Sequence, residues 1–453
     1  MKAVQDDARM PTTGVGVVRL QSRRVTGTVA SLVVLAAITA LNNVDRGLFA
    51  LLLPEVQKSI PLGDALIGVL LGPAFMVVYS VAGLPIAWLA DRWNRRNLIV
   101  WGLAFWSLVT AVTGAATSAV QLLLLRSALG LGEATNIAPT TALVSDLFPM
   151  RQRALAFAVV SVGTPLGTLL CFPLAGRIGA AQGWRPAFVT MGLIGLALAC
   201  AAFLIVREPR AAPAGSPDRS RDSVGNVVRG FASEAVRAMR SRPFRSLVIA
   251  GGFFSCNYAA MAVWTPAFLS RLHGLSVQEV GATLGVYRGA FGIVASLVGG
   301  ALVSLLIRRD ERWIAWVPAL FCGLIVPTEL VLLFTSVRAT WEWALGLETF
   351  FLTAAIPSTF ALLAQVTDVR ARALWCACYF LVFNLLGQSL GPFSVGALSA
   401  RLQPWLTDES LRCALLIAPF CMMCAGIMFL RLGRHMNTAA QSVGPNPFDR
   451  QEL

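Results

Sequence analysis

Charged and metal-binding residues are scarce in this chain. Only 13% of its 453 residues are Asp, Glu, Lys or Arg, and histidine occurs twice. With 56% hydrophobic residues and a mean hydropathy of +0.69, the composition excludes an ordinary soluble domain. Two histidines are too few for a typical metal cluster, and no phosphate-binding P-loop is present. No nucleophile or metal set stands out, so we expect neither an enzyme, nor a cofactor, nor ATP as the energy source.

Cations outnumber anions, with 37 Lys and Arg against 23 Asp and Glu, for a formal net charge of +14. They lie mainly in short loops and at the chain ends, and no basic patch is interleaved with aromatic residues. We therefore expect no nucleic-acid partner. The nine cysteines lie almost entirely inside apolar stretches, and we interpret the C-x-x-C pair Cys421 and Cys424 as small buried hydrophobes rather than a metal or redox site.

About twelve apolar stretches of roughly 18–28 residues follow one another, each long enough to cross a ~30 Å hydrocarbon layer as a helix. A span exposed to lipid must satisfy its own backbone hydrogen bonds, and these stretches are too long for barrel strands. The fold class is therefore an all-α membrane protein. The predicted spans are 27–53, 64–90, 98–118, 121–145, 153–178, 186–206, 245–270, 277–307, 313–336, 341–366, 371–399 and 410–432.

A Pro-, Ser- and Arg-rich segment divides the spans into two sets of six, which predicts two pseudo-symmetric six-helix bundles. Its weakly amphipathic end, from about 224 to 240, predicts a surface helix. The predicted organisation is an N-terminal tail (1–26), a first bundle (27–206), a linker (207–244), a second bundle (245–432) and a C-terminal tail (433–453).

Arginine-rich segments occur in both tails, in the linker and in the loops after the second, fourth, eighth and tenth spans. The opposite loops carry fewer cations, often beside acidic residues. The positive-inside rule therefore places both termini and the linker in the cytoplasm. The N-terminus shows no cleavable signal peptide, so we expect a multi-pass protein of a bacterial inner membrane.

Asp45 and Arg46 stand side by side inside the first apolar stretch. A charge at membrane depth costs ~2.5–3.5 kcal/mol on insertion scales, so such residues usually face a protein interior or a water-filled path. One interpretation is a proton or ion site with the arginine as partner or switch. The other is a structural ion pair that holds two helices together.

The segment GLPIAWLADRWNRRN, residues 83–97, is similar to the cytoplasmic loop signature of the major facilitator superfamily. The resemblance implies that Asp91 closes a cytoplasmic gate by pairing with arginine, and that a cluster of cations faces the cytoplasm. The alternative is simple stop-transfer charge. The predicted gate residues are Asp91, Arg92, Arg95 and Arg96.

In the second half the corresponding copy of this signature reads GGALVSLLIRRD. Ser304 and Leu305 stand where the signature has Asp and Arg. We therefore expect a weaker gate on that side.

A narrower resemblance, to the Spinster-like branch of that superfamily, covers roughly residues 25–430. The segments that show this resemblance include NNVDRGLFALLLPEVQ, RSALGLGEA, SDLFPMRQRALAFAVVSVGTPLGTLL and NLLGQSLGPFSVGALS. Eukaryotic members are lipid exporters. The resemblance implies that Asp45 and Arg46 form a protonation site and its switch, that Glu133 is the acid of the G-E-A motif, and that Arg126 begins that motif.

Spacing favours the same group of residues. Arg126 and Glu133 are seven residues apart, about 10.5 Å along a helix, and project from one face. Asp45 and Glu133 lie about 13 and 20 Å from the outer ends of their spans, near the midplane. A network of these residues with Arg46 is possible, although Arg126 and Glu133 could equally pack the first bundle as a buried ion pair.

Three residues are predicted to bind substrate: Arg288, Asn42 and Glu348. Arg288 lies about 16 Å inside the eighth span, where it could bind an anionic headgroup or pair structurally with Glu348. Glu329 in the ninth span is a further acidic partner. In the fifth span, Gly163, Pro165 and Gly167 predict a kinked, closely packed helix.

Together these observations predict a secondary transporter that is driven by a proton gradient, works by alternating access and carries a lipid-like or anionic amphipath. The expected partners are this substrate and membrane lipids, and the expected state is a monomer. One alternative is an organic-anion/proton symporter of the related anion:cation type. A different class is a non-transporting receptor built on a transporter scaffold.

Overall fold

The computed structural model describes residues 14–90, 93–208, 234–307, 309–310, 312–367, 372–407 and 409–442. Helices account for nearly all of these residues, and no strand occurs among them. The first half contains α1 (Gly14–Gln57), α2 (Asp64–Leu71), α3 (Pro73–Ala90), α4 (Arg95–Thr113), α5 (Ala119–Glu133), α6 (Ile137–Leu147), α7 (Met150–Gln182) and α8 (Trp184–Ile205).

The second half contains two π-helical turns, η1 and η2, each set between two α-helices. Its elements are α10 (Arg242–Leu272), α11 (Val277–Leu284), η1 (Gly285–Ala290), α12 (Phe291–Ile307), α13 (Trp313–Phe334), α14 (Arg338–Val366), α15 (Arg372–Val382), η2 (Phe383–Gln388), α16 (Leu390–Leu406), α17 (Glu409–Leu415) and α18 (Ile417–Ser442).

Eleven helices of the described residues are long and apolar enough to cross a membrane. The predicted fourth span, 121–145, is instead broken: α5 ends at Glu133 and α6 begins at Ile137. Pro139 explains the break, because it has no N–H to donate to the carbonyl of Thr135 and so cannot continue the α5 ladder. The two pieces together make the remaining crossing, which completes the predicted twelve-helix architecture.

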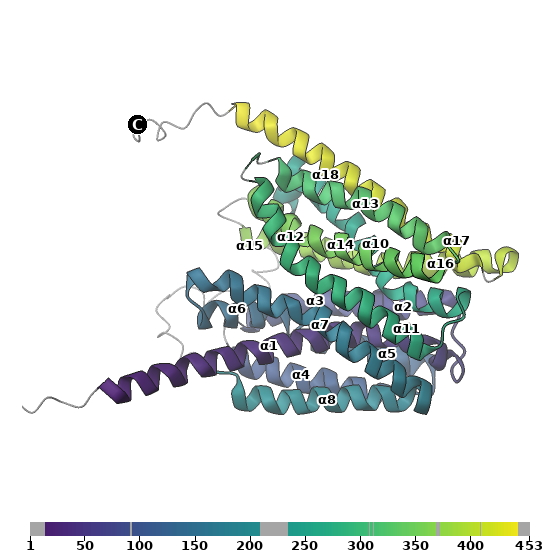
Figure 1. Ribbon diagram of the computed structural model, residues 1–453, viewed down its shortest axis with the longest axis horizontal. Coiled ribbons are helices and arrows are strands. Elements are labelled where there is room, and N and C mark those ends of the chain that lie inside the picture. Colours follow the sequence, from purple (N-terminus) through teal and green to yellow (C-terminus); the bar gives the residue numbers. More distant parts are fainter. Residues whose placement is uncertain are drawn as a thin grey trace, which may run out of the picture.

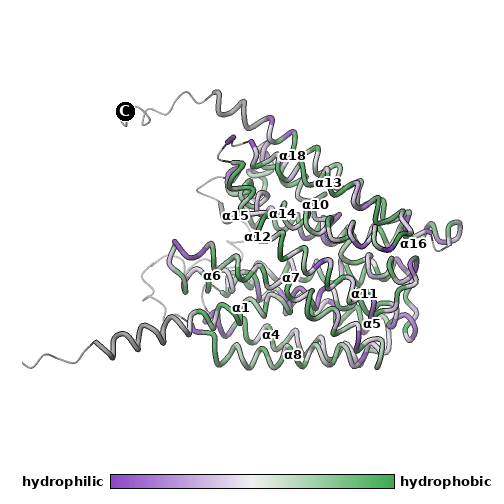
Figure 2. The backbone as a smooth tube through the Cα atoms, viewed as in Figure 1, coloured by the Kyte–Doolittle hydropathy of each residue, from purple (hydrophilic) through white to green (hydrophobic). Residues whose placement is uncertain are grey.

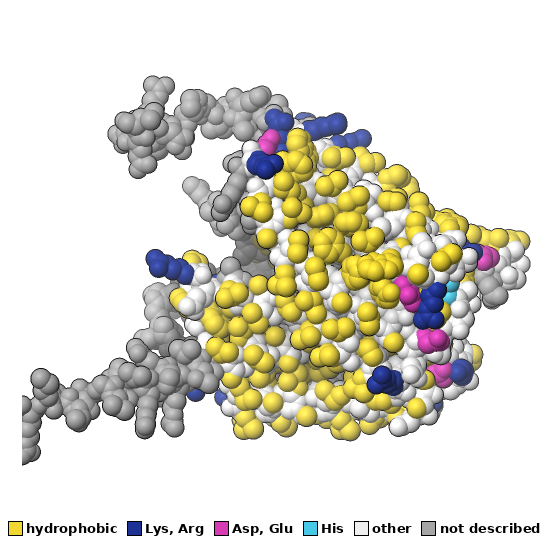
Figure 3. All heavy atoms as spheres, viewed as in Figure 1, with side chains coloured by type: hydrophobic (Ala, Val, Ile, Leu, Met, Phe, Trp, Pro, Cys, Tyr) yellow, Lys and Arg dark blue, Asp and Glu magenta, His cyan; other side chains and the backbone are white. Residues whose placement is uncertain are grey.

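The two halves form two blocks, α1–α8 and α10–α18 (Figure 1). Each block has an apolar cluster of its own, and a third cluster contains buried residues of both halves. Hydrophobic residues run along the helices, and hydrophilic ones gather near their ends (Figure 2). The visible surface is largely covered by hydrophobic side chains (Figure 3), as expected of a protein surrounded by lipid.

We call the end where α1 begins and α18 finishes the terminal end, and the opposite end the distal end. The two blocks meet toward the distal end and diverge toward the terminal end (Figure 1). A Cβ atom at Gly68 would lie 2.8 Å from the carbonyl oxygen of Pro392, and one at Gly281 would lie 2.6 Å from that of Phe172. Glycine is required at both positions because the two halves touch there backbone to backbone.

Close packing within the first half follows the pattern predicted for the fifth span. A Cβ atom at Gly163 would collide with the carbonyl oxygen of Ala36 in α1, and one at Gly167 would lie 2.7 Å from that of Ala40. Pro165 lies inside the same continuous helix, α7. The small residues therefore bring α7 against α1, which carries Asp45 and Arg46.

The linker is described only at its end, since residues 209–233 lie outside the described ones. Residues 234–240 are helical, and the indole nitrogen of Trp375 donates to the Glu234 carboxylate at 3.3 Å. This part of the predicted surface helix therefore docks on the second half. At the chain ends, α1 begins at Gly14 and α18 continues to Ser442, so helix extends into both predicted tails.

Replacing Gly163 by valine should lower the apparent melting temperature in detergent, because the side chain has no room against the α1 backbone. Overpacking of this kind costs about 1–3 kcal/mol. The matched control is Gly252→Val, since nothing lies within 4 Å of a Cβ atom built at Gly252. Equal melting temperatures of the two variants would contradict the close approach of α1 and α7.

Candidate functional site

Arg46 pairs with Glu133 rather than with its neighbour Asp45. Its Nε donates to Glu133 Oε2 at 2.7 Å, and this links α1 to the last residue of α5. Glu133 is fully buried, whereas the Arg46 side chain is 24% exposed. The guanidinium also lies over the rings of Tyr79 and Phe75 in α3, at 4.7 and 5.2 Å from the ring centroids. The predicted proximity of Arg46 and Glu133 is therefore present, and it joins three helices.

Asp45 has no charge partner in contact with it. It is 2% exposed, its Oδ1 makes no hydrogen bond, and no described Lys or Arg side chain forms an ion pair with it. Its side chain faces Trp106 and Thr110 of α4. Arg126 is the nearest candidate partner, but its Nη1 donates to the backbone oxygen of Asp45, at 3.4 Å. The carboxylate thus lies beside an arginine with which it forms no ion-pair contact.

Unpaired polar atoms gather around this carboxylate. Most buried polar atoms in proteins have a hydrogen-bond partner, so a group of exceptions calls for an explanation. Those near Asp45 belong to Asp45 (Oδ1), Arg46 (Nη2), Arg126 (Nε and Nη2) and Glu133 (Oε1). Hydrogen-bond donors and acceptors without partners allow the charged groups to exchange partners. A purely structural ion pair would not need such unpaired groups around it.

Arg288 lies in the π-helical turn η1 and binds neutral groups of α10. Its Nη2 donates to the carbonyl of Met261 at 3.0 Å and to the hydroxyl of Thr265 at 2.8 Å, and its Nη1 donates to the carbonyl of Ala262 at 3.4 Å. Pro266 lies four residues after Ala262, so that carbonyl has no intrahelical donor. The arginine therefore satisfies a carbonyl that the proline leaves open.

Glu348 does not form an ion-pair contact with Arg288 in the described structure, although such a pair is one of the two interpretations of Arg288. Its carboxylate is buried and Oε2 lacks a hydrogen bond, although Arg288 is close enough to act on its charge. In the same half, Asn257 Nδ2 donates to Oε1 of the fully buried Glu329 at 2.6 Å. Among the described residues of the second half, Arg288, Glu329 and Glu348 are therefore not joined by ion-pair contacts.

Asn42, the third predicted substrate residue, lies one turn before Arg46 in α1. It is buried and faces Glu133. The structure therefore brings Asn42 into the group around Asp45 and separates it from Arg288, which belongs to the other half. Its role in binding substrate stays a prediction.

Two of the four predicted gate residues, Asp91 and Arg92, lie outside the described residues, as does the side chain of Ser304 in the second copy of the motif. The other two act within the first half. Arg95 Nη1 pairs with the carboxylate of Asp146 in α6. The cation thus fastens α4 to α6.

The start of α4 is also held by an acidic residue. The Glu208 carboxylate accepts hydrogen bonds from the backbone N–H groups of Arg95, at 3.3 Å, and Arg96, at 2.9 Å. A carboxylate at a helix N-terminus is favourable because it meets free N–H groups and the positive end of the helix dipole. The described contacts of Arg95 and Arg96 do not reach the second half, in keeping with the divergence of the halves at the terminal end.

A charged contact that the sequence did not reveal joins the halves at the distal end. Both terminal nitrogens of Arg271, in α10, donate to the carboxylate of Asp64, in α2, at 2.9 and 2.8 Å. Ser399 of α16 also donates to Asp64, at 2.7 Å, and Gln57 accepts from Arg271 at 3.4 Å. We call this group the distal lock. No local sequence signal could have paired two residues 207 positions apart.

Arg271→Gln should weaken the distal lock and increase the population in which the distal end is open. A partly exposed bidentate pair contributes about 1–3 kcal/mol, enough to shift a two-state population several-fold. Spin labels at Lys58 and Gln403, in a variant without native cysteines, would report the separation of the two halves.

The matched control is Arg338→Gln, because Arg338 pairs with Glu342 four residues away within the second half. The exchanged pair Asp64→Arg/Arg271→Asp should recover part of the closed population. An unchanged label distance in Arg271→Gln would show that this ion pair does not hold the distal end closed.

Comparison with known proteins supplies the family. The sequence matches the family model of the Major Facilitator Superfamily over residues 35–392. An MFS-type efflux pump of Mycolicibacterium smegmatis is 30% identical over 400 residues, which cover 88% of this chain and 90% of the pump. Protein spinster homolog 1 of Bos taurus is 30% identical over 446 residues, which cover 88% of this chain and 79% of that protein.

A solved structure has the same fold. It is that of a bacterial homolog of the human lysosomal transporter Spinster, in an inward-facing and unoccupied conformation. The TM-score is 0.72 at 23% sequence identity, and the match covers 92% of this chain and 97% of that chain.

The family model spans more than half of the chain, and the relatives match it over most of their length. The predicted Spinster-like resemblance and the twelve-helix fold are confirmed, and the expectation of a carrier rather than an enzyme agrees with these relatives. The chain is a multi-pass membrane transporter that belongs to the major facilitator superfamily, with the Spinster-like proteins among its relatives.

Proposed function

We propose that this chain is a proton-coupled secondary transporter in which the Asp45 carboxylate takes up and releases the coupled proton. The observation that carries the proposal is that Asp45 is buried without an ion partner while the adjacent Arg46 is engaged by Glu133. An unpaired charge inside a protein costs several kcal/mol, and binding a proton removes that cost. The gradient then supplies the energy, and no cofactor is needed.

Arg126 is the residue that would sense the proton. Its Nη1 already touches the backbone oxygen of Asp45, and its Nε and Nη2 are buried without partners. When Asp45 loses its proton, the guanidinium can turn from the carbonyl to the carboxylate and form a charge-assisted contact. That exchange would draw α5 toward α1 and strain the Arg46–Glu133 link between the same two helices.

The two halves would alternate around the region between them. The distal lock closes one end, and the helices diverge at the other (Figure 1). With the termini in the cytoplasm, as the loop charges predict, this arrangement opens toward the cytoplasm. The structural relative is itself described as inward-facing, which supports the same orientation.

An anionic amphipath is the substrate class that the second half favours. Arg288 is held by two carbonyls and a hydroxyl, so no contacting carboxylate neutralises its charge. An anion that displaced the Met261 or Thr265 oxygen from Nη2 could bind this guanidinium through two parallel hydrogen bonds. The Spinster-like resemblance favours a lysolipid or sphingoid phosphate. A small organic acid, as in the anion:cation symporters, is the alternative that the same cation would serve.

Asp45→Asn should abolish transport driven by a pH gradient in liposomes, because asparagine keeps the shape of the side chain but cannot exchange a proton. The Arg46–Glu133 ion pair should persist, so the protein should still fold. The control is Glu409→Gln, which removes a carboxylate of an exposed pair with Arg412 in α17. Wild-type rates of gradient-driven transport by Asp45→Asn would falsify the proton assignment.

Arg288→Gln should weaken binding of an anionic lysolipid by about tenfold or more, since a lost charge-assisted contact costs 1.5–3 kcal/mol. Arg288→Lys should restore binding only in part if the contact is bidentate. Thermal shift with lysophosphatidic acid, lysophosphatidylcholine and a hexuronate would separate the substrate classes.

Because both lysolipid headgroups contain a phosphate, unchanged binding of both by Arg288→Gln would contradict a role for Arg288 in recognising negative charge. A response to the hexuronate alone would favour the organic-acid alternative.

A further inference from the structure

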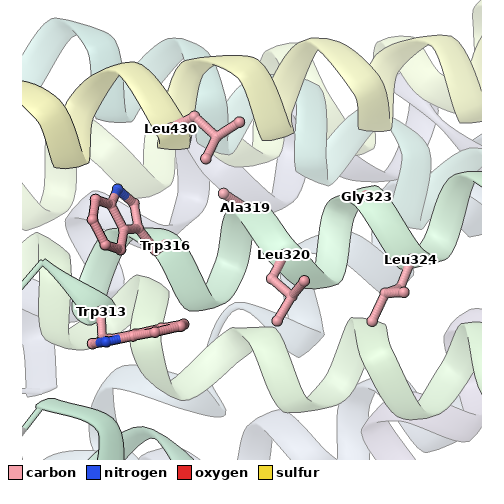
Figure 4. A pocket seen from close by; sticks show the side chains of 7 residues that line it. All are labelled: Trp313, Trp316, Ala319, Leu320, Gly323, Leu324 and Leu430. Carbon is pink, nitrogen blue, oxygen red and sulfur yellow. The ribbon is translucent and has the colours of Figure 1, made fainter.

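A second binding feature lies on the outer surface of the second half, away from the contact between the halves. It is an open apolar groove of about 420 Å³ along α13, to which α18 contributes Leu430 (Figure 4). Its lining residues are Trp313, Trp316, Ala319, Leu320, Gly323, Leu324 and Leu430. Both helices belong to the same half, so the opening and closing of the transporter does not need this groove.

The groove has the length of one leaflet. Trp313 and Leu324 are eleven positions apart in α13, which corresponds to about 16 Å at 1.5 Å per residue. Half of a ~30 Å hydrocarbon core is about 15 Å. Leu320 and Leu324 are exposed along it, and nothing lies within 4 Å of a Cβ atom built at Gly323. The floor of the groove is therefore open enough to admit an acyl chain.

Cations stand at the terminal end of this groove. The Arg312 guanidinium lies 5.8 Å from the ring centroid of Trp316. Arg434 is exposed and lies one helical turn beyond Leu430, on the same face of α18. Figure 3 shows Lys and Arg side chains gathered at this end of the second half. Asp310 is the described acid in this group, and it lies 3.8 Å from Arg312.

Aromatic residues mark the boundary between these two regions. Trp313 and Trp316 pack edge to face, with centroids 5.8 Å apart, at the end of the groove nearest the arginines. Tryptophan prefers the level of the lipid headgroups, because its ring is apolar and its N–H is polar. The succession of cations, tryptophans and exposed leucines matches a phospholipid in the order of headgroup, glycerol region and acyl chain.

We propose that this groove binds one anionic phospholipid of the surrounding bilayer, with an acyl chain along α13 and α18 and the phosphate between Arg312 and Arg434. Positive charge at a membrane surface attracts anionic lipids, and an adjoining apolar groove adds specificity for a chain of one leaflet. The occupant is a membrane component rather than the transported substrate, so the inference does not depend on the proposed function.

The test is native mass spectrometry of the full chain, purified with phosphatidylglycerol or phosphatidylcholine. The wild type should retain one phosphatidylglycerol more strongly than phosphatidylcholine. Arg312→Gln and Arg434→Gln should each weaken retention about fivefold, since a surface cation contributes on the order of that factor. Gly323→Leu should block the acyl chain without disturbing neighbouring atoms.

Two controls separate this site from general effects. Arg151→Gln removes an exposed cation at the terminal end of the other half, and Gly252→Leu adds the same volume at another open helical glycine. Both should retain phosphatidylglycerol like the wild type. Equal retention of the two lipids by the wild type would overturn the headgroup assignment. Unchanged retention in Gly323→Leu would overturn the groove, even if the arginine variants lost lipid.

Discussion

A chain in hydrocarbon must satisfy its own backbone hydrogen bonds, and two of the charged side chains described above, Glu133 and Arg288, lie where the helices fail to do so. The ladder of the fourth crossing stops after Glu133, because Pro139 cannot extend it. Pro266 leaves the carbonyl of Ala262 open, and Arg288 fills it from the π-helical turn η1. Such interruptions place charged side chains at membrane depth and give each of them a fixed direction.

The two halves use charge in opposite ways. In the first half, two arginines and two carboxylates surround one another, yet only Arg46 and Glu133 are in ion-pair contact. In the second half, Arg288 has no acid in contact, and Glu329 is held by an amide. A partly paired cluster responds to a proton, because adding or removing one charge changes which contacts are best. An arginine held by neutral groups instead keeps its charge available to a ligand.

Much of this arrangement follows from the sequence, for identifiable reasons. The apolar stretches are long, so eleven of the twelve spans are helical segments long enough to cross a membrane, and Gly163 and Gly167 pack as their spacing predicts. The proximity of Arg46 and Glu133 could be predicted from the sequence, because an arginine and a carboxylate at similar membrane depth attract each other. The pairing within the cluster was not predictable, since Asp45 and Glu133 compete for the same two arginines and only the packing against α3 and α4 decides.

Contacts between segments that are far apart in the sequence also could not be predicted. Asp64 and Arg271 stand in the flanks of their spans as ordinary loop charges, and only the approach of α2 to α10 and α16 makes them a lock. Arg95, which resembles a gate residue, here fastens α4 to α6 inside one half. A signature motif constrains which residues are available, whereas the conformation decides which of them are in contact.

The distribution of contacts also bears on the balance between the two end states. At the distal end, a bidentate ion pair adds to backbone-to-backbone packing at Gly68 and Gly281. At the terminal end, Arg95 and Glu208 are engaged within the first half, and the second copy of the loop signature has Ser304 where an acid would stand. When the terminal end closes and the distal end opens, the strong contacts at the distal end are lost. Few polar contacts between described residues are available at the terminal end to replace them. In the proposed mechanism, a proton arriving at Asp45 together with an anion at Arg288 would shift this balance by acting on both halves at once.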